Sequence, residues 1–398
     1  MQPVYMDHGA TTPVHPEVVE AMVKAMQANF GNPSSVHAFG RAAKALLEEA
    51  RVSVAALMGA SPEQIIFTSG GTEADNIAIF GAARGMRQKG KGNHIITSAV
   101  EHHAVLDACK ALEKEGFEVT VLPVDEHGQV HVEELEKALR DDTILVTIMH
   151  ANNEVGTIQP IKELARLTKA RGAVFHTDAV QSFGKIPVDV NDLGVDLLSA
   201  SAHKIYGPKG VGCLYVARGV KLTPIGYGGS QEKRRRPGTE NLPGIVGFGK
   251  AAAIAAVEIE EEGTRLRRYR DRLIEGLTAL PHVKLNGHPT NRLPQNVNVS
   301  FQFIEGESLL LMLDMKRIAA SSGSACTSGS LDPSHVLLAM GLSHEIAHGS
   351  LRLTLGRGNT EEEIDYILNT LPEIVERLRA MSPLYEGKEV VMSCTQRR

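Results

Sequence analysis

The feature that most constrains the fold is an alternation of apolar runs and amphipathic stretches between residues 60 and 216. The runs have the length and composition of buried strands, and several of the stretches between them repeat apolar residues with a helical period. Strand–helix alternation of this kind predicts an α/β fold with a mainly parallel, doubly wound sheet. The seven expected strands are QIIFT, HIIT, FEVTVL, TILVTIM, AVFHT, VDLLSA and GCLYV.

The bulk properties bound the class of protein. A chain of 398 residues is too long for one compact core and favours a large domain with a smaller one. The net charge of −5 provides no general attraction to nucleic acid or membranes. No apolar run approaches the roughly 20 residues of a membrane span, and the N-terminus lacks the pattern of a signal peptide. We therefore expect a cytoplasmic protein with no membrane partner and no direct nucleic-acid partner.

The segment from His176 to Gly210 carries the clearest chemistry. Asp178 ends one apolar segment, and Lys204 follows the next. A lysine just beyond a buried strand can form a Schiff base with an aldehyde cofactor, and a nearby carboxylate can keep the pyridine nitrogen of pyridoxal phosphate (PLP) protonated. Ligands of doubly wound sheets bind beyond the carboxyl ends of the strands. Both side chains are therefore expected at one site.

A glycine-rich turn, SGGTE, follows the strand QIIFT and begins a helix. Glycines let the backbone wrap around an anion, and the first turn of a helix offers free N–H groups. Gly71 and Thr72 are therefore candidates for binding the PLP phosphate. A plain glycine turn with a threonine cap is the ordinary interpretation of such a segment outside a PLP-type sheet.

The four cysteines, Cys109, Cys213, Cys326 and Cys394, lack the spacing of a zinc site or a disulfide framework. Cys326 lies in SSGSACTSGS, residues 321–330, whose small polar residues predict a mobile loop. A structural cysteine would need apolar neighbours, so this thiol is expected to be reactive. Cys109 and Cys213 are expected to be structural, and the role of Cys394 is open.

Together these motifs resemble the NifS/IscS group of cysteine desulfurases, within the class V, fold-type I PLP enzymes. The resemblance runs from MDHGATTP near the start to LRLTLGRGNTEEEID near the end. It implies a large PLP-binding domain at residues 15–256 and a smaller α+β domain made of residues 1–14 and 257–398, which carries the loop at 321–330. It also implies conversion of L-cysteine to L-alanine with a persulfide on Cys326. The sulfur would then pass to an acceptor protein, either an iron–sulfur scaffold or a tRNA thiouridylase.

The resemblance also implies further cofactor contacts. His102, in EHHAVLD, matches a histidine that stacks on the PLP ring and relays protons, a role that suits its ordinary pKa. Ser201 and His203 match residues that contact the PLP phosphate. Gln181 can donate to the phenolate oxygen of PLP, and Asn153, in HANNEVG, matches a residue that contacts this oxygen and the substrate carboxylate.

The resemblance also implies contacts to the substrate and to the partner subunit. Arg352, in SLRLTLGR, matches the arginine that clamps the substrate carboxylate, for which a guanidinium is well suited; Arg357 is its competitor. Asn32, in FGNPSS, matches a segment near the substrate. Thr239 matches a residue that reaches the PLP phosphate of the partner subunit, which implies a homodimer.

Other features remain open or depart from the family pattern. HGATTP replaces the more usual NAATTP at His8 and Gly9, and Pro237 replaces a small residue. The basic run at 233–236 is either a solvated face or a nucleic-acid patch. No resident metal is expected, although Cys326 could transiently ligate an iron–sulfur cluster shared with a scaffold. A selenocysteine lyase or a class V aminotransferase would have the same cofactor-binding residues. Neither activity accounts as well for a cysteine in the SSGSACTS motif.

Overall fold

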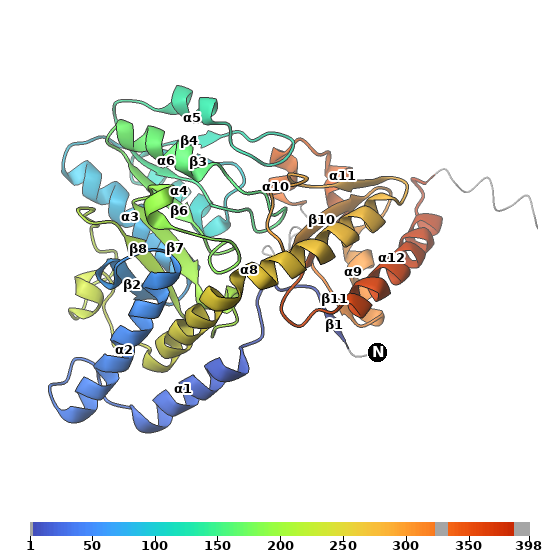
Figure 1. Cartoon of the computed structure of the whole chain (residues 1–398). Coiled ribbons are helices and arrows are strands. Elements are labelled where there is room, and N and C mark those ends of the chain that lie inside the picture. The colour runs from blue at the N-terminus through green and yellow to red at the C-terminus, as the bar shows by residue number, and fades with distance from the viewer. Residues whose placement is uncertain (1–2, 323–332, 386–398) are drawn as a thin grey trace, which may run out of the picture.

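The computed structural model describes residues 3–322 and 333–385, which form a larger and a smaller α/β body (Figure 1). The larger body is built on a seven-stranded sheet in the order β2-β8-β7-β6-β5-β3-β4. Only β8 runs against its neighbours, so the prediction of a mainly parallel sheet is confirmed. The strands are β2 (Ile65–Thr68), β3 (His94–Ser98), β4 (Glu118–Leu122), β5 (Thr143–Thr147), β6 (Val174–Asp178), β7 (Leu197–Ser201) and β8 (Gly212–Val216).

Successive side chains of the central strands enter cores on opposite faces of this sheet. Phe67 and Ile96 pack with residues of α2, α5 and α6, whereas their neighbours Ile66 and Ile95 pack with residues of α3 and α4. Because both faces are covered, these strands read as continuous apolar runs. The helices of this body before residue 200 are α1 (Pro16–Ala28), α2 (Ala38–Leu57), α3 (Gly71–Gln88), α4 (His103–Lys114), α5 (Val132–Ala138), α6 (Ile161–Ala170) and α7 (Val190–Leu193).

Short 3-10 helices interrupt the connections of the larger body. They are η1 (Pro62–Gln64), η2 (Ala202–Lys204) and η3 (Gln231–Arg234). The first leads into β2 and the second follows β7 directly, so η2 places Lys204 just beyond the carboxyl end of a central strand.

The smaller body contains an antiparallel sheet in the order β12-β10-β9 and a parallel pair, β1-β11. Its elements are β1 (Val4–Tyr5), β9 (Val283–Leu285), β10 (Asn296–Phe301), β11 (Ile318–Ala319), β12 (Ser350–Thr354), α9 (Gly306–Met315), α10 (His335–Ala339), α11 (His344–His348) and α12 (Glu361–Met381).

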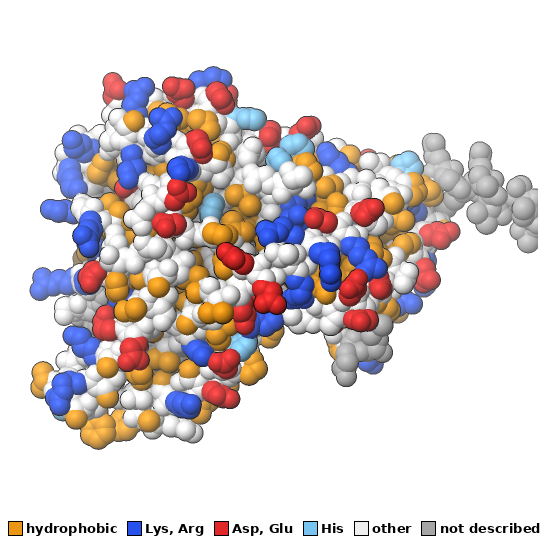
Figure 2. Space-filling view, viewed as in Figure 1, with side chains coloured by type: hydrophobic (Ala, Val, Ile, Leu, Met, Phe, Trp, Pro, Cys, Tyr) orange, Lys and Arg blue, Asp and Glu red, His pale blue; other side chains and the backbone are white. Residues whose placement is uncertain are grey.

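The long helix α8 (Leu242–Thr278) joins the two bodies (Figure 1). Phe248 and Ala252 lie in the core of the larger body, and Leu266 and Leu273 lie in the core of the smaller one. By length and composition α8 could cross a membrane, but half of its most apolar window is buried inside the protein. Its apolar character is therefore explained by its place as a core helix. On the face seen in Figure 2, basic and acidic side chains are interspersed.

The N-terminal segment also connects the bodies. Val4 and Met6 are buried in the smaller core, and β1 pairs with β11. A few residues later, the N–H of Thr12 donates to the carbonyl oxygen of His203 at 3.0 Å. Residues 7–12 therefore run between the two bodies, next to the end of β7.

Candidate active site

A cavity of about 200 Å³ lies at the carboxyl ends of β6 and β7, beside the first turn of α3. This is the edge of a doubly wound sheet at which ligands bind. Nine of the ten residues predicted to bind the cofactor line it. The lining residues are Gly71, Thr72, Asp75, His102, Met149, Ala151, Asn153, Asp178, Val180, Gln181, Ser201, His203 and Lys204.

The amine of Lys204 is held by the N-terminal segment. Its Nζ donates to the carbonyl oxygens of Gly9 and Ala10, at 2.6 and 2.8 Å. The Gln181 side chain donates to the same Gly9 carbonyl at 3.0 Å. Both contacts use the backbone carbonyl of Gly9. The replacement of the more usual alanine by glycine at this position therefore does not remove them.

Two carboxyl groups line the cavity. Asp178 is 6% exposed, and its Oδ1 accepts the N–H of Val180 at 2.8 Å. Burial raises the pKa of Asp178, while the N–H of Val180 and the charges of His102 and Lys204 oppose this shift. Asp75 is 1% exposed, and its pKa is raised well above the ordinary value by burial and by the charge of Asp178. Two carboxyls in so small a cavity favour a cationic group between or beside them.

The histidines of the cavity are oriented by backbone and side-chain contacts. His102 caps α4, and its Nδ1 accepts the N–H of Ala104 at 3.1 Å, so the neutral ring carries its hydrogen on Nε2. Burial lowers the pKa of His102. Nδ1 of His203 lies 3.1 Å from the Thr11 hydroxyl, and burial lowers the pKa of His203 to about 4. Both rings are therefore neutral at pH 7.

Arg352 lies behind Asn153 rather than in the cavity wall. Its guanidinium donates to the carbonyl oxygen of Asn153 at 3.0 Å and to Asp7 at 3.1 Å. The Oδ1 atom of Asn153 is buried without a hydrogen-bond partner. The competitor Arg357 instead pairs with Glu258 and lies over the ring of Tyr206. Arg352 is thus the arginine of the two that contacts a cavity residue.

The first turn of α3 has no room for a side chain at position 71. A Cβ atom on Gly71 would lie 2.6 Å from Cγ2 of Val180, which itself lines the cavity. The hydroxyl of Ser201, another lining residue, is buried without a hydrogen-bond partner. A helix N-terminus and a free hydroxyl are suitable groups for an anion.

Two predicted site residues lie outside this cavity. Thr239 and Asn32 are both exposed, and Oδ1 of Asn32 accepts the N–H of Ser34 at 2.9 Å. Their roles stay predictions. Cys326 and Cys394 lie outside the described residues, whereas Ser321, five residues before Cys326, is bridged to Arg352.

The basic run at 233–236 is partly engaged within the chain. Arg236 pairs with Glu73 in the first turn of α3 at 3.1 Å, and Lys233 donates to the carbonyl oxygen of Glu63 at 2.6 Å. Just before the run, Glu232 forms a buried bidentate pair with Arg51, with both distances 2.8 Å. These contacts favour a loop held on the protein over a free nucleic-acid patch.

The two described cysteines, Cys109 and Cys213, are buried and free. Burial raises the pKa of Cys109 to about 12 and raises that of Cys213 further, so both thiols stay protonated. Within residues 3–322 and 333–385, no group of three or more His, Cys, Asp or Glu side chains is arranged to hold a metal.

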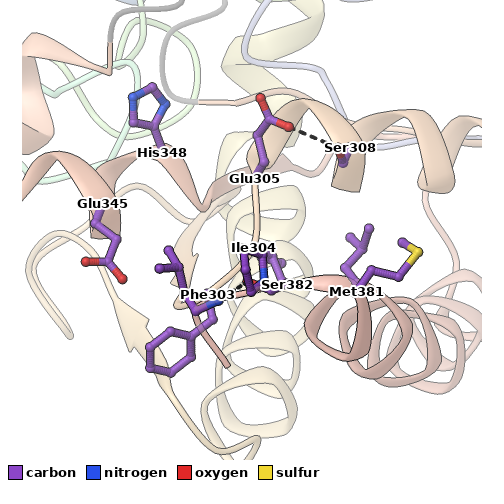
Figure 3. Close-up of a pocket in the computed structure, with 11 residues that line it drawn as sticks. Phe303, Ile304, Glu305, Ser308, Glu345, His348, Met381 and Ser382 are labelled. Carbon is purple, nitrogen blue, oxygen red and sulfur yellow. Dashed lines mark hydrogen bonds between the residues drawn. The ribbon is translucent and has the colours of Figure 1, made fainter. Parts of the chain in front are cut away.

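A larger cavity, of about 410 Å³, lies in the smaller body (Figure 3). Its wall includes Phe303, Met381 and the hydrogen-bonded pair Ser308 and Glu305. The described residues that line it include neither a lysine nor a glycine-rich helix start. The chemistry predicted from the sequence therefore matches the smaller cavity around Lys204.

Sequence reasoning missed several residues of this site. Asp75, Met149, Ala151 and Val180 line the cavity without having been predicted. Asp75 lies four residues after Gly71, one helical turn along α3, so its spacing was the available signal. Met149, Ala151 and Val180 lie just after β5 and β6. Their apolar side chains gave no reason to assign them to a binding site.

Comparisons with known proteins agree with this geometry. Residues 4–367 match the model of the class-V aminotransferase family. The cysteine desulfurase IscS of Methanosarcina thermophila is 59% identical over 381 residues, covering 96% of this chain and 94% of the relative. A solved NifS-like protein superposes with a TM-score of 0.89 at 41% identity, covering 95% of this chain and all of that one. A solved structure of SspA in complex with cysteine has a TM-score of 0.78 at 37% identity, covering 88% of this chain and 98% of that one. The chain therefore belongs to the class-V aminotransferase family, and within it to the IscS group of cysteine desulfurases.

Proposed function

We propose that the cavity around Lys204 binds PLP and is where this cysteine desulfurase takes sulfur from L-cysteine. The observation that carries the proposal is that Lys204, Asp178 and the N-terminus of α3 at Gly71 meet in one cavity. Lys204 would hold the aldehyde carbon of PLP, Asp178 its ring nitrogen and the first turn of α3 its phosphate. We also propose residues 15–256 as the cofactor domain and the remainder as the smaller domain.

The residues present fit this cofactor. The Ser201 hydroxyl and Oδ1 of Asn153 are buried without protein partners and are available to a ligand. Gly71 has no Cβ atom, so Val180 can line the cavity in its observed position. Asp178 is a buried carboxyl, which gains a compensating charge when a protonated ring nitrogen lies beside it.

The chain's own residues would orient the substrate and move its protons. PLP supplies an electron sink for the Cα atom of a bound amino acid. Lys204 Nζ would take and return the Cα proton, and Asp178 would keep the ring nitrogen protonated. His102 can move a proton at Nε2 because its Nδ1 is occupied. Asn153 and Arg352 would hold the substrate carboxylate. The solved relative in complex with cysteine supports cysteine as the substrate.

Cys326 is our proposed acceptor of the sulfur. The Cβ–S bond of L-cysteine breaks, an S–S bond to Cys326 forms, and hydrogen replaces sulfur on Cβ, so the products are L-alanine and a Cys326 persulfide. A thiolate is the nucleophile that this step needs. The SSGSACTS motif supports the assignment, and so does the bridge between Ser321 and Arg352.

A homodimer with shared sites is the proposed assembly, with Thr239 of each chain reaching the PLP phosphate of the other. Large exposed apolar patches on a single chain mark interfaces. Exposed hydrophobic side chains gather over α1 and the start of α2 (Figure 2). They are Val19, Val23, Met26, Phe30, Val36 and Phe39. Sedimentation of a fully active monomer would contradict the dimer.

The destination of the sulfur is the finer part of the proposal. We propose a cytoplasmic enzyme whose persulfide passes to an acceptor protein, either an iron–sulfur scaffold or a tRNA thiouridylase, and whose Cys326 can share a cluster transiently with a scaffold. Incubating the persulfide form with each purified acceptor, and following the loss of sulfur from Cys326, would separate the two.

The cofactor assignment is tested by adding PLP to cofactor-free protein. Wild type and the exposed control Lys209→Ala should gain visible absorbance that hydroxylamine abolishes. Lys204→Ala should keep its circular dichroism but gain no such absorbance, because it lacks the amine that holds the aldehyde. Equal absorbance in Lys204→Ala would overturn the assignment.

A further inference from the structure

The described residues on either side of 323–332 are attached to two residues next to the cavity, Arg352 and Glu154. Before this segment, Ser321 and Arg352 exchange two backbone hydrogen bonds, of 3.2 and 2.7 Å. After it, the Ser334 hydroxyl donates to the carboxylate of Glu154. Glu154 directly follows Asn153, which lines the cavity. One attachment therefore uses the predicted substrate arginine, and the other uses the neighbour of the predicted substrate asparagine.

The backbone of Glu154 is fixed in place, so its carboxylate is a stationary anchor. Its N–H donates to the side chain of Asn152 at 2.9 Å. Its carbonyl oxygen accepts from the side-chain amides of Asn296 and Asn298, at 3.0 and 3.1 Å, both on β10 of the smaller body. Glu154 is also only 4% exposed, so water does not compete with Ser334 for its carboxylate.

Ser334 is held as firmly as its partner. It is 4% exposed and caps α10, with its hydroxyl oxygen accepting the N–H of Leu337 at 3.3 Å. The next residue, His335, lies 3.0 Å through Nε2 from the carbonyl oxygen of Glu101, the neighbour of His102. The start of α10 thus rests on the chain segments that carry two cavity residues.

Burying the carboxyl group of Glu154 costs folding free energy. Burial raises the pKa of Glu154 to about 7, while the hydrogen bond from Ser334 and the charge of Arg352 oppose the shift. A buried carboxyl destabilises a fold unless it is well paired. A glutamate that only filled space here would be better replaced by an apolar residue, so a role in placing Ser334 explains it.

We propose that Glu154 is a positioning residue for the sulfur-transfer step. Glu154 binds Ser334 and so holds this residue near Asn153. Ser334 lies just after the segment that contains Cys326. The inference rests on the proposed role of Cys326 as sulfur acceptor. Glu154 acts through Ser334 and need not touch substrate or cofactor.

Four single variants test this inference. Glu154→Gln keeps the shape but removes the charge, and Ser334→Ala removes the donor. Ser334→Thr keeps the hydroxyl and should rescue function. Ser343→Ala is the matched control, because Ser343 caps the equally short α11 through the N–H of Ile346 but is exposed and has no carboxylate bond.

In single-turnover experiments with L-cysteine, Glu154→Gln and Ser334→Ala should form persulfide about 10- to 100-fold more slowly, since small misplacements of a reacting group cost this much. KM for L-cysteine should stay near the wild-type value, and the double variant should be no slower than the slower single variant. Ser334→Thr and Ser343→Ala should stay within about 2-fold of wild type.

Hydrogen exchange of residues 333–341 in the cofactor-free protein provides a readout that does not need turnover. Exchange should be faster in Glu154→Gln than in wild type, although the cap of α10 remains. Wild-type exchange in Glu154→Gln, or equal persulfide rates in Ser334→Ala and Ser343→Ala, would overturn the inference. Failure of the wild-type enzyme to place sulfur on Cys326 would instead overturn the proposed function, and the exchange result would still decide whether Glu154 anchors α10.

Discussion

The Nζ atom of Lys204 lies 2.6 Å from the carbonyl oxygen of Gly9, although 195 residues separate them in the sequence. The same carbonyl accepts from Gln181, so one backbone group of the N-terminal segment orients two residues of the cavity. The segment that carries it runs from the core of the smaller body to the larger one. Any movement of one body relative to the other would therefore change the hydrogen bonds of the Lys204 amine.

Gly71→Ala should weaken PLP binding by about 10-fold or more, because its Cβ would lie 2.6 Å from Cγ2 of Val180 and one of these two lining residues would have to move. Val180→Ala should restore most of the affinity when it is combined with Gly71→Ala, since the clashing methyl group is gone. The control is Gly358→Ala, because a Cβ there meets no atom within 4 Å. PLP titration of the four proteins measures the effect, and equal affinity in Gly71→Ala and wild type would refute it.

Arg352→Gln should raise KM for L-cysteine by about 30-fold or more, because losing one partner of a buried charge pair costs at least ~2 kcal/mol. Arg357→Gln should change KM far less, since Arg357 is occupied by Glu258. Steady-state kinetics of both variants would decide. The opposite order of effects would show that the substrate carboxylate is bound elsewhere.

His150 should contribute a loss of stability as the pH falls from 7 to 5. Burial lowers the pKa of His150 to about 4, below the ordinary 6.5. Its contribution is complete above pH 6.5 and is lost as the pH falls, because the unfolded chain takes up the proton first. At pH 5 the loss is about 2 kcal/mol.

His150→Gln should flatten this dependence, whereas the exposed control His344→Gln should not. The urea midpoints of the three proteins at pH 7 and pH 5 measure the difference. Parallel pH dependence in wild type and His150→Gln would contradict the assignment.

The larger sheet could be predicted because its strands lie between two covered faces and therefore read as apolar runs. β1 and β9 could not, because two or three residues carry no periodic signal. The cluster around Lys204 and Asp178 was accessible from the sequence, since both follow strands whose carboxyl ends meet at one edge.

The contacts of Gly9 were not accessible, because nothing local in HGATTP reveals a partner 195 residues away. Asp75 was hidden for a different reason: an aspartate in the first turns of a helix usually stabilises the helix dipole at the surface, whereas this one is 1% exposed. Thr239 and Asn32 do not line the cavity around Lys204, so their proposed roles depend on contacts that one chain does not show.

The most direct test of the account is to locate the sulfur after one turnover. Wild-type enzyme given one equivalent of L-cysteine, alkylated and mapped by mass spectrometry should carry one additional sulfur atom on Cys326. Cys326→Ser should bind PLP normally but release almost no L-alanine, because a hydroxyl is a poor nucleophile toward sulfur. Cys109→Ser and Cys213→Ser should behave like wild type, since both thiols are buried. Sulfur on Cys394, or full alanine production by Cys326→Ser, would contradict the account.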